Sequence, residues 1–255
     1  MTSSGNTWDQ LILSHNADKR LESLQANGTL LAVFPEVQSL VGFGGGDSGH
    51  KNLWAHTKQV VIQCVPILAV RWAALFHDVG KPQAFQRIDG KICFHHHEAV
   101  SASLFKRAAK RVGWFEPRLE EEISFVIRNV GLAEAYESSW SDSAVRRLSK
   151  DLGGYADMVL ALARGDSTTG NPTKHKKHLD KTSELQKRIE ALRVQDTTPQ
   201  ALPKGLGDAL MAELKLEAGP ELGRVMSGLK QAVEAGKLPR NAEFEVYLQH
   251  LRSSV

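Results

Sequence analysis

The stretch from Arg71 to Ala102 gathers histidine and carboxylate side chains at high density. It holds four His, two Asp and one Glu, and an apolar segment begins it. Imidazole nitrogens and carboxylate oxygens together are typical ligands of a borderline divalent cation. We therefore expect the chemistry of this chain to be centred on a metal ion bound near this stretch.

Four positions have the character of metal ligands: His56, the adjacent pair His77 and Asp78, and Asp166. Neighbouring residues of a helix point about 100° apart. One ion can therefore be reached by both members of the pair only if it lies beside the end of their helix. His56 and Asp166 would then approach it from two neighbouring helices.

Four motifs resemble those of the HD phosphohydrolase superfamily. They are H-x-x-L-W-x-H-T at 50–57, H-D-V-G-K-P at 77–82, F-x-x-H-E-x-x-S-A at 94–102 and A-R-G-D-S-T-T at 163–169. More narrowly, the chain resembles the HD half of bacterial tRNA nucleotidyltransferases, the CCA-adding enzymes, and the similarity extends over about residues 17–236. The resemblance implies a helical fold with a metal site.

By position in these motifs, the resemblance assigns His56, His77, Asp78 and Asp166 as ligands of a divalent ion such as Mn²⁺, Ni²⁺, Co²⁺ or Mg²⁺. Related HD proteins often have a histidine where this chain has Asn129 or Val130. We therefore expect one tightly held ion, while a second ion near His97 stays open.

Three further side chains are candidates for substrate contact: Lys81, His97 and Arg164. Lys81 and His97 are also the candidate catalytic residues, because an ammonium and an imidazolium neutralise charge that develops on phosphoryl oxygens. Alternatively, Lys81 is a solvated lysine, and His97 with Glu98 merely begins a helix. His95 and His96 alternate across a strand end, so at most one faces the site.

The activity implied is a metal-dependent phosphohydrolase or phosphodiesterase. Its substrate would be a 2′,3′-cyclic phosphodiester, a phosphate monoester or a nucleotide, at an RNA end or in a small molecule. The alternative is a non-catalytic tRNA-binding module that works with a separate nucleotidyltransferase. The Gly-Ser pair and paired carboxylates of a nucleotidyltransferase head are not found before His50, which argues against CCA addition by this chain.

The elements that must position these residues are helices. The pattern predicts an all-α fold with one small β-hairpin: helices over residues 8–25, 66–78, 97–112 and 173–194, a hairpin with its turn at Asp89-Gly90, and three helices after Pro203. We expect an HD domain over 1–195 and a C-terminal helical extension over 196–255. The glycine-rich segment 41–49 is predicted to be a loop.

Composition favours a soluble cytoplasmic protein. No apolar run is long enough for a membrane span, the first residues lack an export signal, and there are only two Cys. The net charge of +3 is small, but residues 167–190 are locally basic. This segment either attracts phosphate backbones or is simply a solvated helix face, and the sequence leaves both open. The oligomeric state is not predicted.

Overall fold

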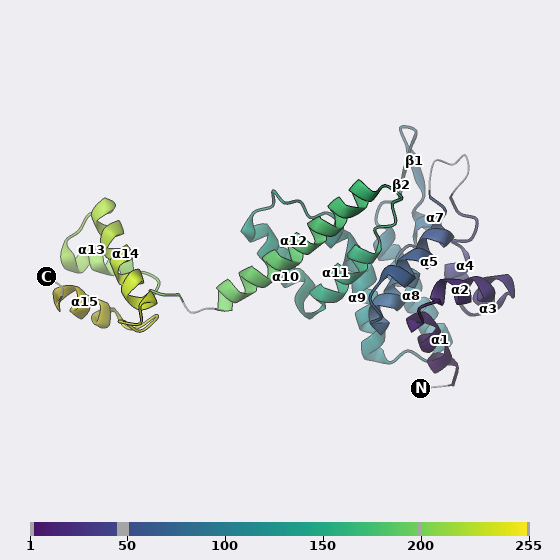
Figure 1. Cartoon of the computed structure of the whole chain (residues 1–255), viewed down its shortest axis with the longest axis horizontal. Coiled ribbons are helices and arrows are strands. Elements are labelled where there is room, and N and C mark those ends of the chain that lie inside the picture. Colours follow the sequence, from purple (N-terminus) through teal and green to yellow (C-terminus); the bar gives the residue numbers. More distant parts are fainter. Residues whose placement is uncertain (1–2, 45–50, 198–199, 254–255) are drawn as a thin grey trace. The chain divides into compact units, whose positions relative to one another are not determined.

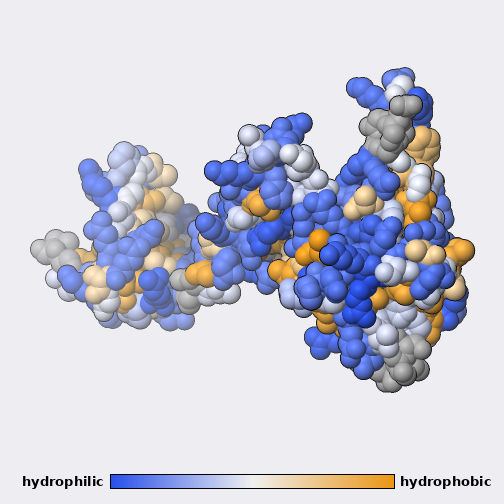
Figure 2. Space-filling view, turned by 45° about the vertical axis from the view of Figure 1, so that its right-hand side comes forward, coloured by the Kyte–Doolittle hydropathy of each residue, from blue (hydrophilic) through white to orange (hydrophobic). Residues whose placement is uncertain are grey.

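The computed structural model describes residues 3–44, 51–197 and 200–253. In these ranges the protein is helical apart from one two-stranded sheet, so the predicted fold class is confirmed (Figure 1). Much of the predicted loop at 41–49 lies outside the described residues. No described helix is both long enough and apolar enough to cross a membrane, and the face in Figure 2 is mainly hydrophilic.

The chain divides into two compact units, residues 1–190 and 191–255. The helices that begin in the first unit are α1 (Ser3–Leu13), α2 (Ala17–Ala26), α3 (Thr29–Val33), α4 (Pro35–Gln38), α5 (Leu53–Gln63), α6 (Leu68–Phe76), α7 (Lys81–Ala84), α8 (His97–Val112), α9 (Pro117–Glu134), α10 (Asp142–Leu152), α11 (Ala156–Gly165) and α12 (Pro172–Thr197). The predicted boundary at 195/196, and the assignment of each part as a domain, stay predictions.

Helix α6 is the centre of the first unit. Every residue from Ala69 to Phe76 is buried, because this helix is apolar on nearly all sides. It packs against α5, α9 and α11. The Trp72 ring lies 5.6 Å from the Phe34 ring, and the Trp72 indole donates a hydrogen bond to Asp9. The end of α6, where the chemistry is expected, is thereby held on several sides.

The single helix predicted over residues 8–25 is wrong. The chain forms two helices, α1 and α2, which are separated at Ser14–Asn16. Arg71 of α6 is buried, and its guanidinium donates hydrogen bonds to the carbonyl oxygens of Ile12 and Ser14. A buried guanidinium needs such acceptors. The chain thus leaves the helix where Arg71 needs carbonyl acceptors, although the local sequence pattern favours a continuous helix.

The predicted hairpin is present. Strands β1 (Gln86–Ile88) and β2 (Lys91–Cys93) pair antiparallel, with Arg87 opposite Ile92. Asp89 and Gly90 in the turn have φ values of 49° and 74°, and positive φ at both central residues is the geometry that Asp-Gly turns favour. In Figure 1 the hairpin projects from the helices of its unit.

In the described part of the second unit three helices begin, as predicted: α13 (Leu206–Leu214), α14 (Pro220–Glu234) and α15 (Phe244–Ser253). Their shared core consists of Leu206, Leu210, Leu229, Val233, Tyr247 and Leu248. The Tyr247 hydroxyl accepts a hydrogen bond from the Ala242 amide and lies 2.9 Å from the Pro239 carbonyl oxygen. The unit therefore has an apolar core of its own.

Candidate metal centre

The four predicted ligands meet at one end of the helices of the first unit. His56 lies in the first turn of α5, which the Asn52 side chain caps by accepting a hydrogen bond from the Ala55 amide. His77 and Asp78 directly follow α6, and Asp166 directly follows α11. His56, His77 and Asp78 are buried. An Asn side chain at the position before a helix stabilises the start of that helix, because it accepts a hydrogen bond from an amide that has no partner within the helix.

The distances between the four side chains suit a shared cation. One ligand atom each from His56, His77 and Asp166 lie within 4.8 Å of one another. The Oδ2 atom of Asp78 is 3.4 Å from the Nε2 atoms of both histidines. Two ligands about 2.0–2.2 Å from one ion are separated by about 3–4 Å. The cluster therefore has nearly the spacing of a coordination sphere.

The hydrogen bonds of this cluster support the same interpretation. His77 donates from Nδ1 to the Ala74 carbonyl oxygen, at 2.8 Å, so Nε2 is the nitrogen that faces the cluster and could bind a metal ion once its proton is lost. Fixing the tautomer in this way is what metal-binding histidines require. Among the described residues, three buried atoms here form no hydrogen bond of good geometry: His77 Nε2, Asp78 Oδ1 and Asp166 Oδ1. Imidazole nitrogens lie near both oxygens, at 2.8 Å from Asp166 Oδ1 and 3.5 Å from Asp78 Oδ1. Buried polar atoms are seldom left without a hydrogen bond of good geometry, and a divalent cation fits this donor set.

The charged groups of the cluster shift one another's pKa values. Burial alone would lower the pKa of His77, but the charges of Asp78 and Asp166 outweigh it and raise that pKa to about 9. Burial opposes the ionisation of both carboxyls, but the charge of His77 and the neighbouring imidazole nitrogens hold the pKa of Asp78 and of Asp166 well below the usual range. Both carboxylates are thus charged at neutral pH, as a cation site requires.

Two of the predicted substrate-contacting residues adjoin the cluster. The Lys81 ammonium is 2.7 Å from Asp78 Oδ2 and lies over the Phe94 ring, 5.8 Å from its centre. His97 begins α8, and its Nε2 is 3.5 Å from Asp78 Oδ1. Its Nδ1 donates to the Phe94 carbonyl oxygen, so Nε2 is the atom turned to the site. Their roles stay predictions.

The third predicted contact residue is not brought to the cluster. The Arg164 guanidinium donates a hydrogen bond to Gln186 of α12. Arg164 and Asp166 are two residues apart, which places them about 200° apart around a helical axis. The substrate-binding role of Arg164 stays a prediction. His95 and His96 are both exposed.

A cavity of about 630 Å³ opens beside Asp166, and some of the residues that line it were not predicted as site residues from the sequence. Lys51 lines it, and its ammonium is 3.0 Å from His56 Nε2. Glu134 also lines it, and burial of its carboxyl beside Asp166 raises its pKa to about 8. Thr168 contacts His56 Nδ1 at 2.7 Å. Lys51 and Thr168 lie inside the motifs, but Glu134 has no sequence signal.

Two glycines allow the helices to approach closely enough to form the cluster. A Cβ atom on Gly80 would collide with the His97 carbonyl oxygen and come 2.7 Å from the Ser101 nitrogen. The Gly80 amide donates a hydrogen bond to the Ser101 hydroxyl instead. A Cβ atom on Gly165 would collide with Cys64 Sγ. Gly80 therefore brings α8 to Asp78, and Gly165 brings the end of α11 to α5.

Comparison with known proteins agrees with this geometry. Residues 55–164 match the family model described as HD domain. The chain is 30% identical to the CC-adding tRNA nucleotidyltransferase of Thermus thermophilus over 95% of its own length and 26% identical to the A-adding tRNA nucleotidyltransferase of Deinococcus radiodurans over 94%. It spans only 55% and 56% of those two proteins. A shorter match, 32% identity over 83 residues, joins it to the multifunctional CCA protein of Ectopseudomonas mendocina, covering 29% of this chain and 20% of that protein. The resemblance expected from the motifs is confirmed.

Proposed function

Because residues 55–164 match the HD domain model, we propose that the chain is a metal-dependent phosphohydrolase. Its substrate is a phosphoester at an RNA end or in a small nucleotide, with a 2′,3′-cyclic phosphodiester as the first candidate. One observation carries the proposal: His56, His77 and Asp166 offer ligand atoms within 4.8 Å of one another, with Asp78 3.4 Å from both imidazoles.

The residues that would hold the ion are His56, His77, Asp78 and Asp166. A divalent cation bound there supplies Lewis-acid activation of a water molecule and of the phosphoryl group. We expect Mn²⁺, Ni²⁺, Co²⁺ or Mg²⁺, since imidazole favours the transition metals and carboxylate accepts all four.

The other residues of the site act on the charge of the phosphoryl group. Lys81 carries an ammonium 2.7 Å from Asp78, where a phosphoryl oxygen would compete for it. His97 turns Nε2 to the same carboxylate, and from that atom an imidazolium can donate a proton to the leaving alcohol. Lys51 and Lys174 line the cavity beside Asp166 and add positive charge for an anionic substrate.

A substrate panel tests this function. Cyclic nucleotides, nucleoside monophosphates and short RNAs with cyclic or monoester ends are incubated with each of the four cations. We expect hydrolysis of at least one class, and a loss of about 100-fold or more in Asp78→Asn, because removing one oxyanion- or metal-directed group costs about that much. Asp89→Asn, at an exposed hairpin turn, is the matched control and keeps its activity. Full activity of Asp78→Asn would refute the proposal.

A second candidate function is a non-catalytic tRNA-binding module that works with a separate nucleotidyltransferase. It is favoured by the relatives, whose names describe tRNA nucleotidyltransferases and which align with nearly the whole chain. This function predicts tRNA binding in EDTA, with no hydrolysis of any substrate in the panel. The affinity for tRNA would depend less strongly on salt concentration when Lys174, Lys176 and Lys177 are neutralised.

A further inference from the structure

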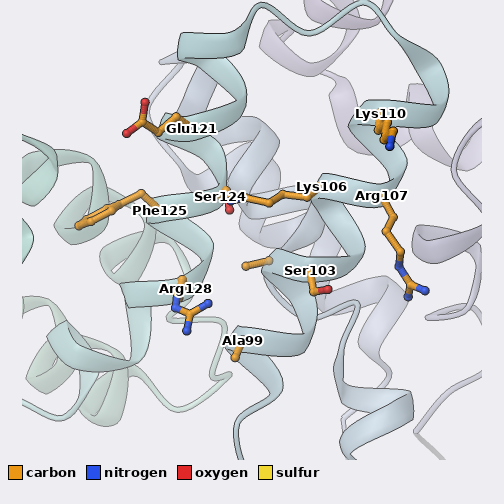
Figure 3. Close-up of a pocket in the computed structure, with 10 residues that line it drawn as sticks. Ala99, Ser103, Lys106, Arg107, Lys110, Glu121, Ser124, Phe125 and Arg128 are labelled. Atoms are coloured by element: carbon orange, nitrogen blue, oxygen red, sulfur yellow. The ribbon is translucent and has the colours of Figure 1, made fainter.

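Helices α8 and α9 enclose a second cavity, of about 600 Å³. Four cationic side chains line it: Lys106, Arg107 and Lys110 from α8, and Arg128 from α9. Glu121 is the one carboxylate among the lining residues. Figure 3 shows the Lys106 side chain reaching from α8 toward Ser124 of α9. We call this cavity the α8–α9 groove.

The charge of the groove is a large part of the charge of the protein. The lining residues carry four positive charges and one negative charge, and this excess of three equals the formal net charge of the entire chain, +3. The remaining charged residues therefore cancel one another in total. A groove with one sign of charge concentrates counter-ions and anionic ligands.

The four cations are unpaired among the residues that the structure describes. Within the described part of the chain, none of them forms an ion pair or a side-chain hydrogen bond, and all four are exposed. Arg111 on the same helix behaves differently: both of its Nη atoms bond the Glu36 carboxylate, at 2.6 and 2.7 Å. An incoming anion would displace only water from the groove, whereas it would have to compete with Glu36 for Arg111.

The groove is separate from the metal centre. Ala99 lines the groove, and His97, two residues earlier on α8, faces Asp78. Two helical residues correspond to a rotation of about 200°, so these contacts lie on opposite faces of α8. None of the four predicted metal ligands lines the groove. A ligand of the groove would therefore bind without touching the metal ligands.

The dimensions favour a chain of phosphates over a single nucleotide. From Ala99 to Lys110 the lining face of α8 is about 16 Å long, at about 1.5 Å per residue. Phe125 is the only aromatic residue of the lining, and its ring packs against Tyr155, with 4.8 Å between the ring centres. The lining therefore has no pair of aromatic rings between which a base could stack. Recognition would thus depend on phosphates spread along the helix.

We propose that the α8–α9 groove binds consecutive phosphate groups in the backbone of an RNA strand. The choice of RNA rests on the proposed function, in which the substrate carries an RNA end. The cations contact phosphates, and Ser103 and Ser124 supply hydroxyl groups in the same lining. Binding is independent of base sequence, since the contacts are to the backbone.

The test measures binding of a fluorescent single-stranded oligoribonucleotide to the full-length chain, in EDTA, over a series of salt concentrations. Each phosphate contact contributes about −0.7 to the slope of log K against log[salt] for single strands. Lys106→Gln/Lys110→Gln should reduce the slope by about 1.4 and weaken binding by about tenfold at 0.15 M salt. Lys19→Gln/Arg20→Gln, which removes two exposed charges from α2, is the matched control and keeps the wild-type slope.

A variant that is expected to tighten RNA binding provides a second test. Glu121→Gln removes the carboxylate of the groove and should tighten RNA binding several-fold, while Arg128→Gln weakens it from the α9 side. An unchanged slope in Lys106→Gln/Lys110→Gln would overturn the proposal. So would displacement of the RNA by inorganic tripolyphosphate at equal concentration, because the groove would then be a site for a short polyphosphate. Since EDTA removes the ion that hydrolysis needs, a failure of the proposed hydrolysis leaves this result unaffected.

Discussion

His56 Nε2 lies 2.8 Å from Asp166 Oδ1, although Asp166 follows His56 by 110 positions in the chain. The contact joins the start of α5 to the end of α11, two helices that pack against each other and against α6. Because the two residues are so distant in sequence and meet beside a second histidine, the fold itself is the scaffold of the proposed metal site.

The first prediction concerns the charge of that carboxylate. Asp166→Asn keeps the size of the side chain but removes its negative charge, so we expect affinity for Mn²⁺ or Ni²⁺ to fall by at least about 10- to 100-fold, the range seen even for changes around the ligands. Titration calorimetry on metal-stripped protein measures it. Asp157→Asn, an exposed residue at the start of the same helix, is the control. Equal affinity in both variants would contradict the ligand assignment.

The second prediction concerns pH. The folded protein raises the pKa of His77 from 6.5 to about 9, so the metal-free folded state binds this proton more tightly than the unfolded chain does. The resulting stability is fully present below pH 6.5 and is lost as the pH rises to about 9. Thermal melts in EDTA should therefore show decreasing stability over that window, and His77→Gln should flatten the trend.

The same proton competes with the metal. A divalent ion must displace it from His77, so apparent metal affinity should rise between pH 6.5 and 9 in the wild-type protein. Binding accompanied by proton release, detected as a dependence of the calorimetric heat on the buffer, is the expected signature. A pH-independent affinity would show that His77 carries no proton to displace.

The third prediction concerns Gly165. A Cβ atom there would collide with Cys64 Sγ, so Gly165→Ala must push α11 away from α5. Ala normally stabilises a helix relative to Gly by about 0.5–1 kcal/mol; here we expect a loss of about 1–3 kcal/mol from overpacking and weaker metal binding, because Asp166 is the next residue. Gly154→Ala, with no atom within 4 Å of the new Cβ, is the matched control. Denaturant unfolding measures both.

Motif spacing could predict those features of the site that depend on local chain geometry. His77 and Asp78 are adjacent in sequence at the end of an apolar helix, and the sequence pattern predicts that helix. Arg164 was predicted as a contact because it is close to Asp166 in sequence, but a rotation of about 200° turns it to Gln186 instead. Glu134 reaches the cavity at the last residue of α9, which depends on how α9 packs and leaves no trace in spacing.

The break between α1 and α2 has the same kind of cause. The local pattern of residues 8–25 suits one helix, and the carbonyl oxygens that Arg71 needs lie about sixty positions earlier in the chain. Local propensity is a weak prior that tertiary contacts override. The hairpin turn at Asp89-Gly90 was predictable because its positive φ values are a requirement of the two residues themselves.

The last prediction concerns the second unit. The buried Tyr247 hydroxyl accepts from the Ala242 amide at 3.0 Å and is 2.9 Å from the Pro239 carbonyl oxygen. Tyr247→Phe leaves both groups without this partner, so we expect residues 191–255 to lose about 1–3 kcal/mol, measured by hydrogen exchange of α13 to α15. Tyr155→Phe makes the same chemical change at a ring that packs against Phe125 in the first unit and should leave that exchange unchanged. Metal affinity should not change in Tyr247→Phe, because all four proposed ligands lie in the first unit; a parallel loss of metal binding would show that the two units fold as one.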